Sequence, residues 1–398
     1  MKTIEELSAL LSRAHEERNA VVITGGGTLT GMGLPPSQRE TTVSTLGFDA
    51  IVEDAPADLT IAVQSGVRVR ALMQRLSTHG TQIPFDAPRP SDATVGGTLA
   101  AGWLGPRRHL YGRPRDFVIG SVSVLADGTI ARAGGMVVKN VAGYDMSRLY
   151  VGSFGTLAVL VQVNFKTIAA PEQTRAFTMR LPEGTRGRAL ELIGLLDVTP
   201  AAAFWVDGFK NAIDGDEGAE GRLVVVLEGS AAVVDRGTRD LRAAMGRAGV
   251  PETRIIDGGA RETFERVVDA YVAPVGERSI TYRIAAFPDE AIDRLVRVTQ
   301  LAQRFELRHD ALIDAMNGDI IVRVSDLDAY ALGAKIEMFD DALHDEEPLA
   351  MVIAGNHAKR PLLAVWGRET EGFEQMRALK DRFDPNRILN PGRFLAGL

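Results

Sequence analysis

The hydrophobic and polar positions divide the chain into two regions with different patterns. Before residue 160, short runs of β-branched and apolar residues alternate with glycine-rich loops, a pattern typical of strands joined by turns. The predicted strands are 20–24, 59–63, 118–125 and 156–166. Residues 1–20 predict an amphipathic helix, and 67–79 predict a second helix with Val69, Leu72, Met73 and Leu76 on one face.

After Pro171, which marks a boundary, strands and helices follow each other in a regular order. Residues 174–257 predict the order β-α-β-β-α-β, and residues 279–354 predict the same order again without matching residue identities. Helices are expected at 186–196, 231–248, 288–304 and 327–343, with another in the linker 258–278. Two split β-α-β units of this kind can form one larger antiparallel sheet covered by helices, so the sequence predicts an α+β fold.

Length, composition and charge narrow the class of protein. The 398 residues allow two or three domains, and 45% hydrophobic with 24% charged residues exclude a disordered or fibrous chain. A net charge of −7 without long basic runs argues against nucleic acid as the main ligand. The absence of cysteine excludes disulfides, thiolate nucleophiles and iron–sulfur clusters on this polypeptide.

No stretch resembles a signal peptide or a membrane-spanning helix. We therefore expect a cytoplasmic protein with at most peripheral contact with the inner face of the membrane, made through partners.

Three glycine-rich segments before residue 160 carry the chemical signal. The first, 21–33, is a strand that opens into Gly25-Gly26-Gly27-Thr28-Leu29-Thr30-Gly31, a loop that can turn backbone N–H groups toward an anion. It lacks the spacing of a dinucleotide-binding Rossmann loop or a Walker loop. The second is 90–102, and the third is 139–157. Glycine and small hydroxyl residues in such loops let the backbone approach a pyrophosphate or a flat ring, although each alone is also compatible with a plain turn.

Taken together, these segments resemble the FAD-binding oxidoreductases of the vanillyl-alcohol oxidase type, and among them the FAD-binding subunits of bacterial glycolate oxidases. The resemblance rests on the triple glycine, Thr94-Val95-Gly96-Gly97, the segment 111–116, Gly143-Tyr144-Asp145 and the segment 152–157. It implies an FAD-binding domain of two α/β subdomains over residues 1–170 and an antiparallel-sheet cap of ferredoxin-like units over 171–364. Residues 365–398 are then expected to return to the FAD domain.

The resemblance also implies which residues bind FAD. On one side of the pyrophosphate it places Gly25, Gly26, Gly27, Thr28, Thr30 and Gly31, and on the other Asp92, Thr94, Gly96 and Gly97. It places Gly152, Ser153, Gly155, Thr156 and Val159 beside the dinucleotide, with Gly143, Tyr144 and Asn390 as further cofactor neighbours. Because residues 20–34 contain no His, Tyr or Cys, we expect FAD to be bound without a covalent link.

Catalytic residues are not evident from the sequence. Oxidation of a 2-hydroxy acid by a flavin needs a base and a cation for the carboxylate. Related D-2-hydroxy-acid dehydrogenases have a histidine-rich metal motif, but the region 308–321 here contains only His309, and no Glu-His-Gly follows. We predict no metal site. His357 is a weak candidate near the flavin, and Arg283, Arg323 and Arg360 are candidate carboxylate ligands or plain surface arginines.

These observations predict an FAD-binding subunit of a glycolate oxidase-like complex that relays electrons from a second flavin subunit, with an iron–sulfur subunit as a further partner. Two alternatives stay open. The chain could be a stand-alone FAD-dependent dehydrogenase or oxidase of a hydroxy acid or alcohol, or a non-catalytic scaffold that retains flavin to stabilise an assembly.

Overall fold

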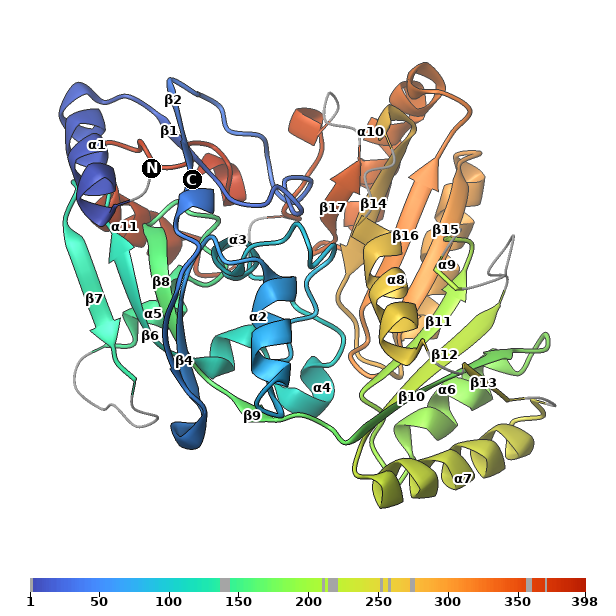
Figure 1. Cartoon of the computed structure of the whole chain (residues 1–398). Helices are drawn as coiled ribbons and strands as arrows, with labels where there is room; N and C mark the ends of the chain where they lie inside the picture. Colours follow the sequence, from blue (N-terminus) through green and yellow to red (C-terminus); the bar gives the residue numbers. More distant parts are fainter. Residues whose placement is uncertain are drawn as a thin grey trace. The chain divides into compact units, whose positions relative to one another are not determined.

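The computed structural model describes residues 3–136, 144–209, 212–213, 221–250, 253–256, 259–272, 276–355, 360–368 and 371–398. It divides into two compact units, shown in Figure 1. The first unit consists of Met1–Leu104, Arg113–Ala170 and Glu369–Leu398, and the second of Gly105–Gly112 and Pro171–Arg368. None of the described helices combines the length and hydropathy needed to cross a membrane.

The first unit contains a five-stranded antiparallel sheet in the order β3-β4-β8-β6-β7. Its strands are β3 (Ile51–Ala55), β4 (Thr60–Gln64), β6 (Val118–Val124), β7 (Ile130–Gly134) and β8 (Val159–Lys166). Two short pairs complete the strands of this unit, β1 (Val21–Thr24) parallel to β2 (Thr41–Ser44) and β5 (Thr81–Gln82) antiparallel to β9 (Ile168–Ala169). The helices are α1 (Ile4–Glu17), α2 (Val69–Ser77), α3 (Val95–Ala100), α5 (Met146–Tyr150) and α11 (Phe373–Phe383).

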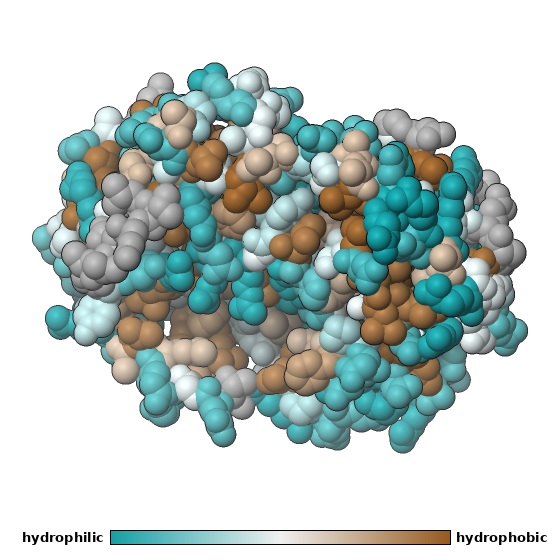
Figure 2. All heavy atoms as spheres, turned by 90° about the horizontal axis from the view of Figure 1, so that it is seen from below, coloured by the Kyte–Doolittle hydropathy of each residue, from teal (hydrophilic) through white to brown (hydrophobic). Residues whose placement is uncertain are grey.

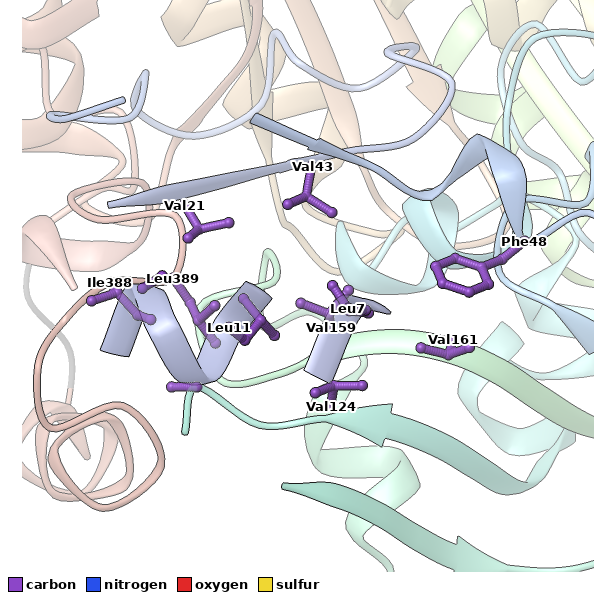
Figure 3. Close-up of a cluster of buried hydrophobic side chains, with 12 residues drawn as sticks. Leu7, Leu11, Val21, Val43, Phe48, Val124, Val159, Val161, Ile388 and Leu389 are labelled. Carbon is purple, nitrogen blue, oxygen red and sulfur yellow. The ribbon is translucent and has the colours of Figure 1, made fainter. Parts of the chain in front are cut away.

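A hydrophobic core joins helix α1, strand β1 and the C-terminal tail of the chain. Thr3 caps α1 by accepting a hydrogen bond from the Glu6 amide, and Leu7 and Leu11 follow on one helical face. These leucines pack with a group of buried residues drawn in Figure 3: Ala14, Val21, Val43, Phe48, Val124, Ala126, Val159, Val161, Ile388 and Leu389. Residues from both ends of the chain therefore share one core, which fixes the tail against β1.

The second unit contains an eight-stranded antiparallel sheet in the order β13-β10-β12-β11-β15-β16-β14-β17. The strands are β10 (Gln173–Arg180), β11 (Ala202–Asp207), β12 (Arg222–Gly229), β13 (Arg254–Ile256), β14 (Ser279–Ile284), β15 (Arg308–Asp314), β16 (Ile320–Ser325) and β17 (Met351–Gly355). The helices are α4 (Arg108–Tyr111), α6 (Arg186–Gly194), α7 (Ala231–Arg247), α8 (Ala260–Val272), α9 (Ala291–Arg304) and α10 (Ala329–Glu346).

This sheet is built from two β-α-β-β-α-β halves that join through β11 and β15. Side chains alternate between its two faces, so Trp205 and Tyr282 point to the side where Arg186 of α6 and Asp340 of α10 contact them. Phe204 points to the other side and packs on Phe264 of α8. The predicted α+β class, with a second domain of two repeated units in one antiparallel sheet, is confirmed.

Candidate functional site

The triple-glycine loop follows directly from β1 and is packed too tightly for side chains at its first two positions. A Cβ on Gly25 would lie 2.5 Å from Thr94 Oγ1, and a Cβ on Gly26 would lie 1.8 Å from the carbonyl oxygen of Asp92. Gly27 differs, because it has a φ of +74° and no atom within 4 Å of an added Cβ. The loop therefore packs against the 90–97 segment at its start and presents its backbone to open space at Gly27.

The second glycine-rich segment meets this loop through a threonine. Thr94 Oγ1 caps α3 by accepting a hydrogen bond of 3.2 Å from the Gly97 amide, and it also accepts one of 3.4 Å from the Gly26 amide. A Cβ on Gly96 would lie 2.6 Å from the Cβ of Ser65, so this turn of the helix also requires glycine. The structure thus brings together two segments that the resemblance placed on opposite sides of a pyrophosphate.

The third segment joins the far end of α3. The amides of Gly152 and Phe154 donate to the carbonyls of Leu99 and Ala100 over 2.9 and 2.8 Å. Ser153 and Thr156 are buried, and their hydroxyls donate to the carbonyls of Tyr150 and Ser153 at 2.8 and 2.7 Å. All three glycine-rich segments are therefore connected through α3 within the first unit.

Asn390 lies between the first and third segments. Its Oδ1 accepts a hydrogen bond of 2.8 Å from the Ile23 amide, and its Nδ2 donates one of 2.7 Å to the Phe154 carbonyl. A Cβ on Gly155 would lie 2.8 Å from that Nδ2. With both amide atoms bonded to backbone groups, Asn390 links two loops.

The remaining predicted site residues have different surroundings. Val159 points into the hydrophobic core of Figure 3, so only its backbone can face a ligand. Tyr144 has 92% of its surface exposed and is neither a core nor a boundary residue. Thr30 donates to the Gly27 carbonyl over 3.2 Å, and the Asp92 side chain is exposed. Gly31 follows in the same loop, whereas Gly143 lies outside the described residues.

Two arginines that the sequence did not single out brace these loops. The Arg68 guanidinium donates to the carbonyl of Asp92, and Arg89 Nη2 donates to the carbonyl of Thr28 over 3.0 Å. Both contacts join residues that are 24 or more positions apart, so nothing in the local pattern signals them.

In the second unit, the two arginines considered as carboxylate ligands are engaged by groups of the chain itself. Arg283 forms a bidentate pair with Asp319, with its Nε 3.1 Å from Oδ2 and its Nη2 3.1 Å from Oδ1. Arg323 is buried and donates to the Ala270 carbonyl at 2.6 Å and to Thr281 Oγ1 at 3.2 Å. Neither is the solvent-facing arginine that was the alternative interpretation. The side chain of Arg360 and all of His357 lie outside the described residues.

The segment Gly105–Gly112 packs with the second unit through further charged pairs. Arg107, nearly fully buried, lies 3.2 Å from both carboxylate oxygens of Glu228, to which Tyr111 also donates a hydrogen bond. Arg108 Nη2 lies 2.8 Å from Asp319 Oδ2, and its Nη1 lies 3.6 Å from Asp314 Oδ2. Burial raises the pKa of Asp314 to about 7, although Arg108 opposes this effect.

Among the residues that the structure describes, no three His, Asp or Glu side chains are grouped so that they could hold a metal ion.

Comparison with known families identifies the cofactor. The FAD binding domain family matches residues 1–145, and the family of FAD linked oxidases, C-terminal domain, matches residues 359–394. The fit agrees with the geometry, because glycines without room for a side chain and one glycine open to its surroundings form a cradle suited to a pyrophosphate. The chain is a flavoprotein whose cofactor is FAD.

Individual relatives narrow the class further. The chain is 26% identical to glycolate oxidase subunit GlcD of Bacillus subtilis, over 99% of this chain and 88% of that protein. It is 27% identical to the D-lactate dehydrogenase of Archaeoglobus fulgidus, over 99% of this chain and 90% of that enzyme. A shorter match, 32% identical over 52% of this chain and 60% of the relative, is glycolate oxidase subunit GlcE of Escherichia coli. This chain is an FAD-binding oxidoreductase that is similar to glycolate oxidase subunits and to D-lactate and D-2-hydroxyglutarate dehydrogenases.

Solved structures agree on the fold. p-Cresol methylhydroxylase with bound substrate superimposes with a TM-score of 0.77 at 15% identity, covering 99% of this chain and 87% of that chain. Alkyldihydroxyacetonephosphate synthase superimposes with a TM-score of 0.69 at 16% identity, covering 97% of this chain and 74% of that one. The predicted fold of the vanillyl-alcohol oxidase type is therefore confirmed.

Proposed function

We propose that this chain is the electron-relaying FAD subunit of a glycolate oxidase-like complex. A partner flavin subunit oxidises a small 2-hydroxy acid and passes the electrons to FAD held by this chain, and an iron–sulfur subunit takes them onward. FAD is bound without a covalent link. Its cofactor contacts are proposed to be Gly25, Gly26, Gly27, Thr28, Thr30, Gly31, Asp92, Thr94, Gly96, Gly97, Gly143, Tyr144, Gly152, Ser153, Gly155, Thr156, Val159 and Asn390.

The observation that carries the relay role is the internal pairing of Arg283 and Arg323. A 2-hydroxy acid needs a cation that can bind its carboxylate, and a paired guanidinium must first give up its partner. Arg283 already has a carboxylate, Asp319, in the bidentate position that a substrate would take. Binding a substrate there would cost the free energy of breaking a largely buried ion pair.

Composition supports the need for partners. When bound, FAD accepts two electrons and can release them to another redox centre. The chain has no cysteine and so cannot ligate an iron–sulfur cluster by thiolates to carry electrons further. The match to glycolate oxidase subunit GlcE, a protein named as one subunit of an oxidase, is consistent with a place in an assembly. In that assembly, peripheral contact with the inner face of the membrane would be made by partners.

The test is an anaerobic flavin titration of the FAD-loaded chain. We expect the flavin absorbance near about 450 nm to bleach with dithionite and to persist with glycolate or D-lactate, and to bleach with hydroxy acid once the partner flavin subunit is added. The Arg283→Lys variant is the matched control, and its flavin absorbance should respond to each reagent as that of wild type does. Bleaching of the isolated wild-type chain by a hydroxy acid within seconds would refute the relay role.

A second candidate function is a stand-alone hydroxy-acid dehydrogenase. It is favoured by similarity to the D-lactate dehydrogenase of Archaeoglobus fulgidus along nearly the whole chain. It predicts that D-lactate alone bleaches the flavin and that the Arg283→Lys variant does so more slowly, which the same titration measures.

A further inference from the structure

A buried lysine near the C-terminus lies behind the proposed FAD loops. The side chain of Lys380, in the last turn of α11, is 2% exposed. Its Nζ is 2.7 Å from Asp384 Oδ2, 2.8 Å from the Thr156 carbonyl and 3.2 Å from the Leu389 carbonyl. An ammonium group has three N–H donors, so one side chain joins the helix, the end of the 152–157 loop and the tail with all of its hydrogens used.

Asp384 completes the same arrangement. Its carboxylate is fully buried and accepts hydrogen bonds from the amides of Ile388 and Leu389, over 3.0 and 2.8 Å, besides the one from Lys380. These contacts hold the tail in position beside β1, where the Val21 amide donates to Ile388 and the Val21 carbonyl accepts from Asn390. Asn390 follows Leu389 in this tail, and its side chain contacts the backbone of Ile23 and Phe154.

The continuous set of contacts therefore runs from Lys380 through the tail to both loops. One end is the carbonyl of Thr156, and the other is the amide of Ile23, two residues before the first glycine of the triple-glycine loop. All of these residues belong to the first unit. Small shifts of the tail would change the distance between the two loops because the Asn390 side chain spans them.

Stability alone is a weak reason for such a pair. A buried ion pair loses its hydration, and replacing both partners by neutral groups often leaves the free energy of unfolding unchanged or raises it. Burial lowers the pKa of Lys380, an effect opposed by the charge of Asp384. With its three hydrogen bonds, the Lys380 ammonium group fixes the geometry of three separate segments of the chain.

We propose that Lys380 is a positioning residue for FAD, which sets the separation of the triple-glycine loop and the 152–157 loop through Asp384 and Asn390. The inference rests on the proposed contacts of those loops with FAD. It assigns the C-terminal tail a role in cofactor geometry without direct contact between Lys380 and the cofactor.

The test separates cofactor geometry from folding. The variants are Lys380→Met, the neutral double variant Lys380→Met/Asp384→Asn, and Asn390→Leu. For each, the Kd for FAD is measured by flavin fluorescence, the flavin environment by visible circular dichroism, and the stability of the FAD-free chain by urea unfolding. Lys335→Met is the matched control, because Lys335 also pairs with an aspartate, Asp326, at 2.9 Å, but in the second unit.

We expect the double variant to remain folded without urea, although the carbonyls of Thr156 and Leu389 lose a donor, and to bind FAD about tenfold or more weakly, with an altered visible circular dichroism spectrum. The double variant tests the proposal even where Lys380→Met does not fold, and Asn390→Leu should give the same spectral change. Wild-type affinity and spectrum in the double variant would overturn the inference whatever Asn390→Leu shows, because Asn390 is itself a proposed FAD contact. Failure of the wild-type chain to bind FAD would instead refute the proposed loop contacts.

Discussion

The charge state of Asp314 should make the stability of the second unit depend on pH. Asp314 ends β15 and is buried, with Oδ2 2.8 Å from Asn317 Nδ2 and 3.6 Å from Arg108. Its Oδ1 has no hydrogen-bond partner among the described residues. Burial raises the pKa of Asp314 from 3.8 to about 7, with the nearby Asp319 acting in the same direction and Arg108 against it.

The sign and size of the effect follow from this pKa. Below pH 3.8 the carboxyl is protonated in the folded and unfolded chain, and its contribution to stability is fully present. Between 3.8 and about 7 the unfolded chain is ionised while the folded chain keeps the proton, so stability falls as the pH rises. At about 1.4 kcal/mol per pH unit, the total loss is about 4 kcal/mol, and about 3 kcal/mol of it falls between pH 5 and pH 8.

The assay compares wild type with Asp314→Asn, which cannot ionise. Urea unfolding is followed by tryptophan fluorescence at pH 5, 6, 7 and 8, since Trp205 and Trp366 lie in the second unit. The free energy of unfolding of the variant relative to wild type should rise by about 3 kcal/mol across this range. Asp341→Asn, at an exposed position of α10, is the control and should follow wild type. Parallel curves for wild type and Asp314→Asn would refute the reasoning, because they would mean that Asp314 stays ionised beside Arg108 throughout.

Three further outcomes are expected. Gly26→Ala should abolish measurable FAD binding in a fluorescence titration while α1 and the sheets stay folded by circular dichroism, because the added Cβ would overlap the carbonyl of Asp92. Thr94→Val should lower the free energy of unfolding by about 1 kcal/mol in urea, since it removes the cap of α3. Asp319→Asn should lower the free energy of unfolding by about 3 kcal/mol in urea, because Arg283 then lacks its counter-charge. Adding sulfate should raise the free energy of unfolding of this variant more than that of wild type.

The elements of the second unit could be predicted because their signals are local. The helix expected at 231–248 is α7 (Ala231–Arg247), and the helix expected at 186–196 is α6 (Arg186–Gly194). Each has a hydrophobic period that shows over one segment of chain. The order of the strands then follows from the split β-α-β units, whose second strands meet as β11 and β15. The sequence could suggest that the two halves pair, but it could not show which residues pair, because partners such as Phe204 and Asp314 lie far apart in the sequence.

The glycine-rich loops could likewise be found from composition, whereas the residues that support them could not. Gly25 and Gly26 stand out because several glycines occur together. Arg68, Arg89 and Lys380 act through carbonyl groups of distant residues, and any backbone carbonyl is an equally plausible partner in the sequence. A partial signal was available for Lys380, since an Asp four residues later at the end of a helix is the spacing of a helical ion pair.

Arg107 and Arg108 show why the surroundings of a charged residue cannot be inferred from its charge alone. In the sequence they belong to a basic stretch that suggests either a solvated loop or a phosphate site. In the structure their guanidinium groups are largely buried against Glu228 and Asp319, more than 100 positions further along the chain. Asp319 thereby pairs with both Arg108 and Arg283. One carboxylate thus pairs with two guanidinium groups, one of them the candidate carboxylate ligand Arg283, and this pairing between residues far apart in the chain cannot be inferred from the local sequence.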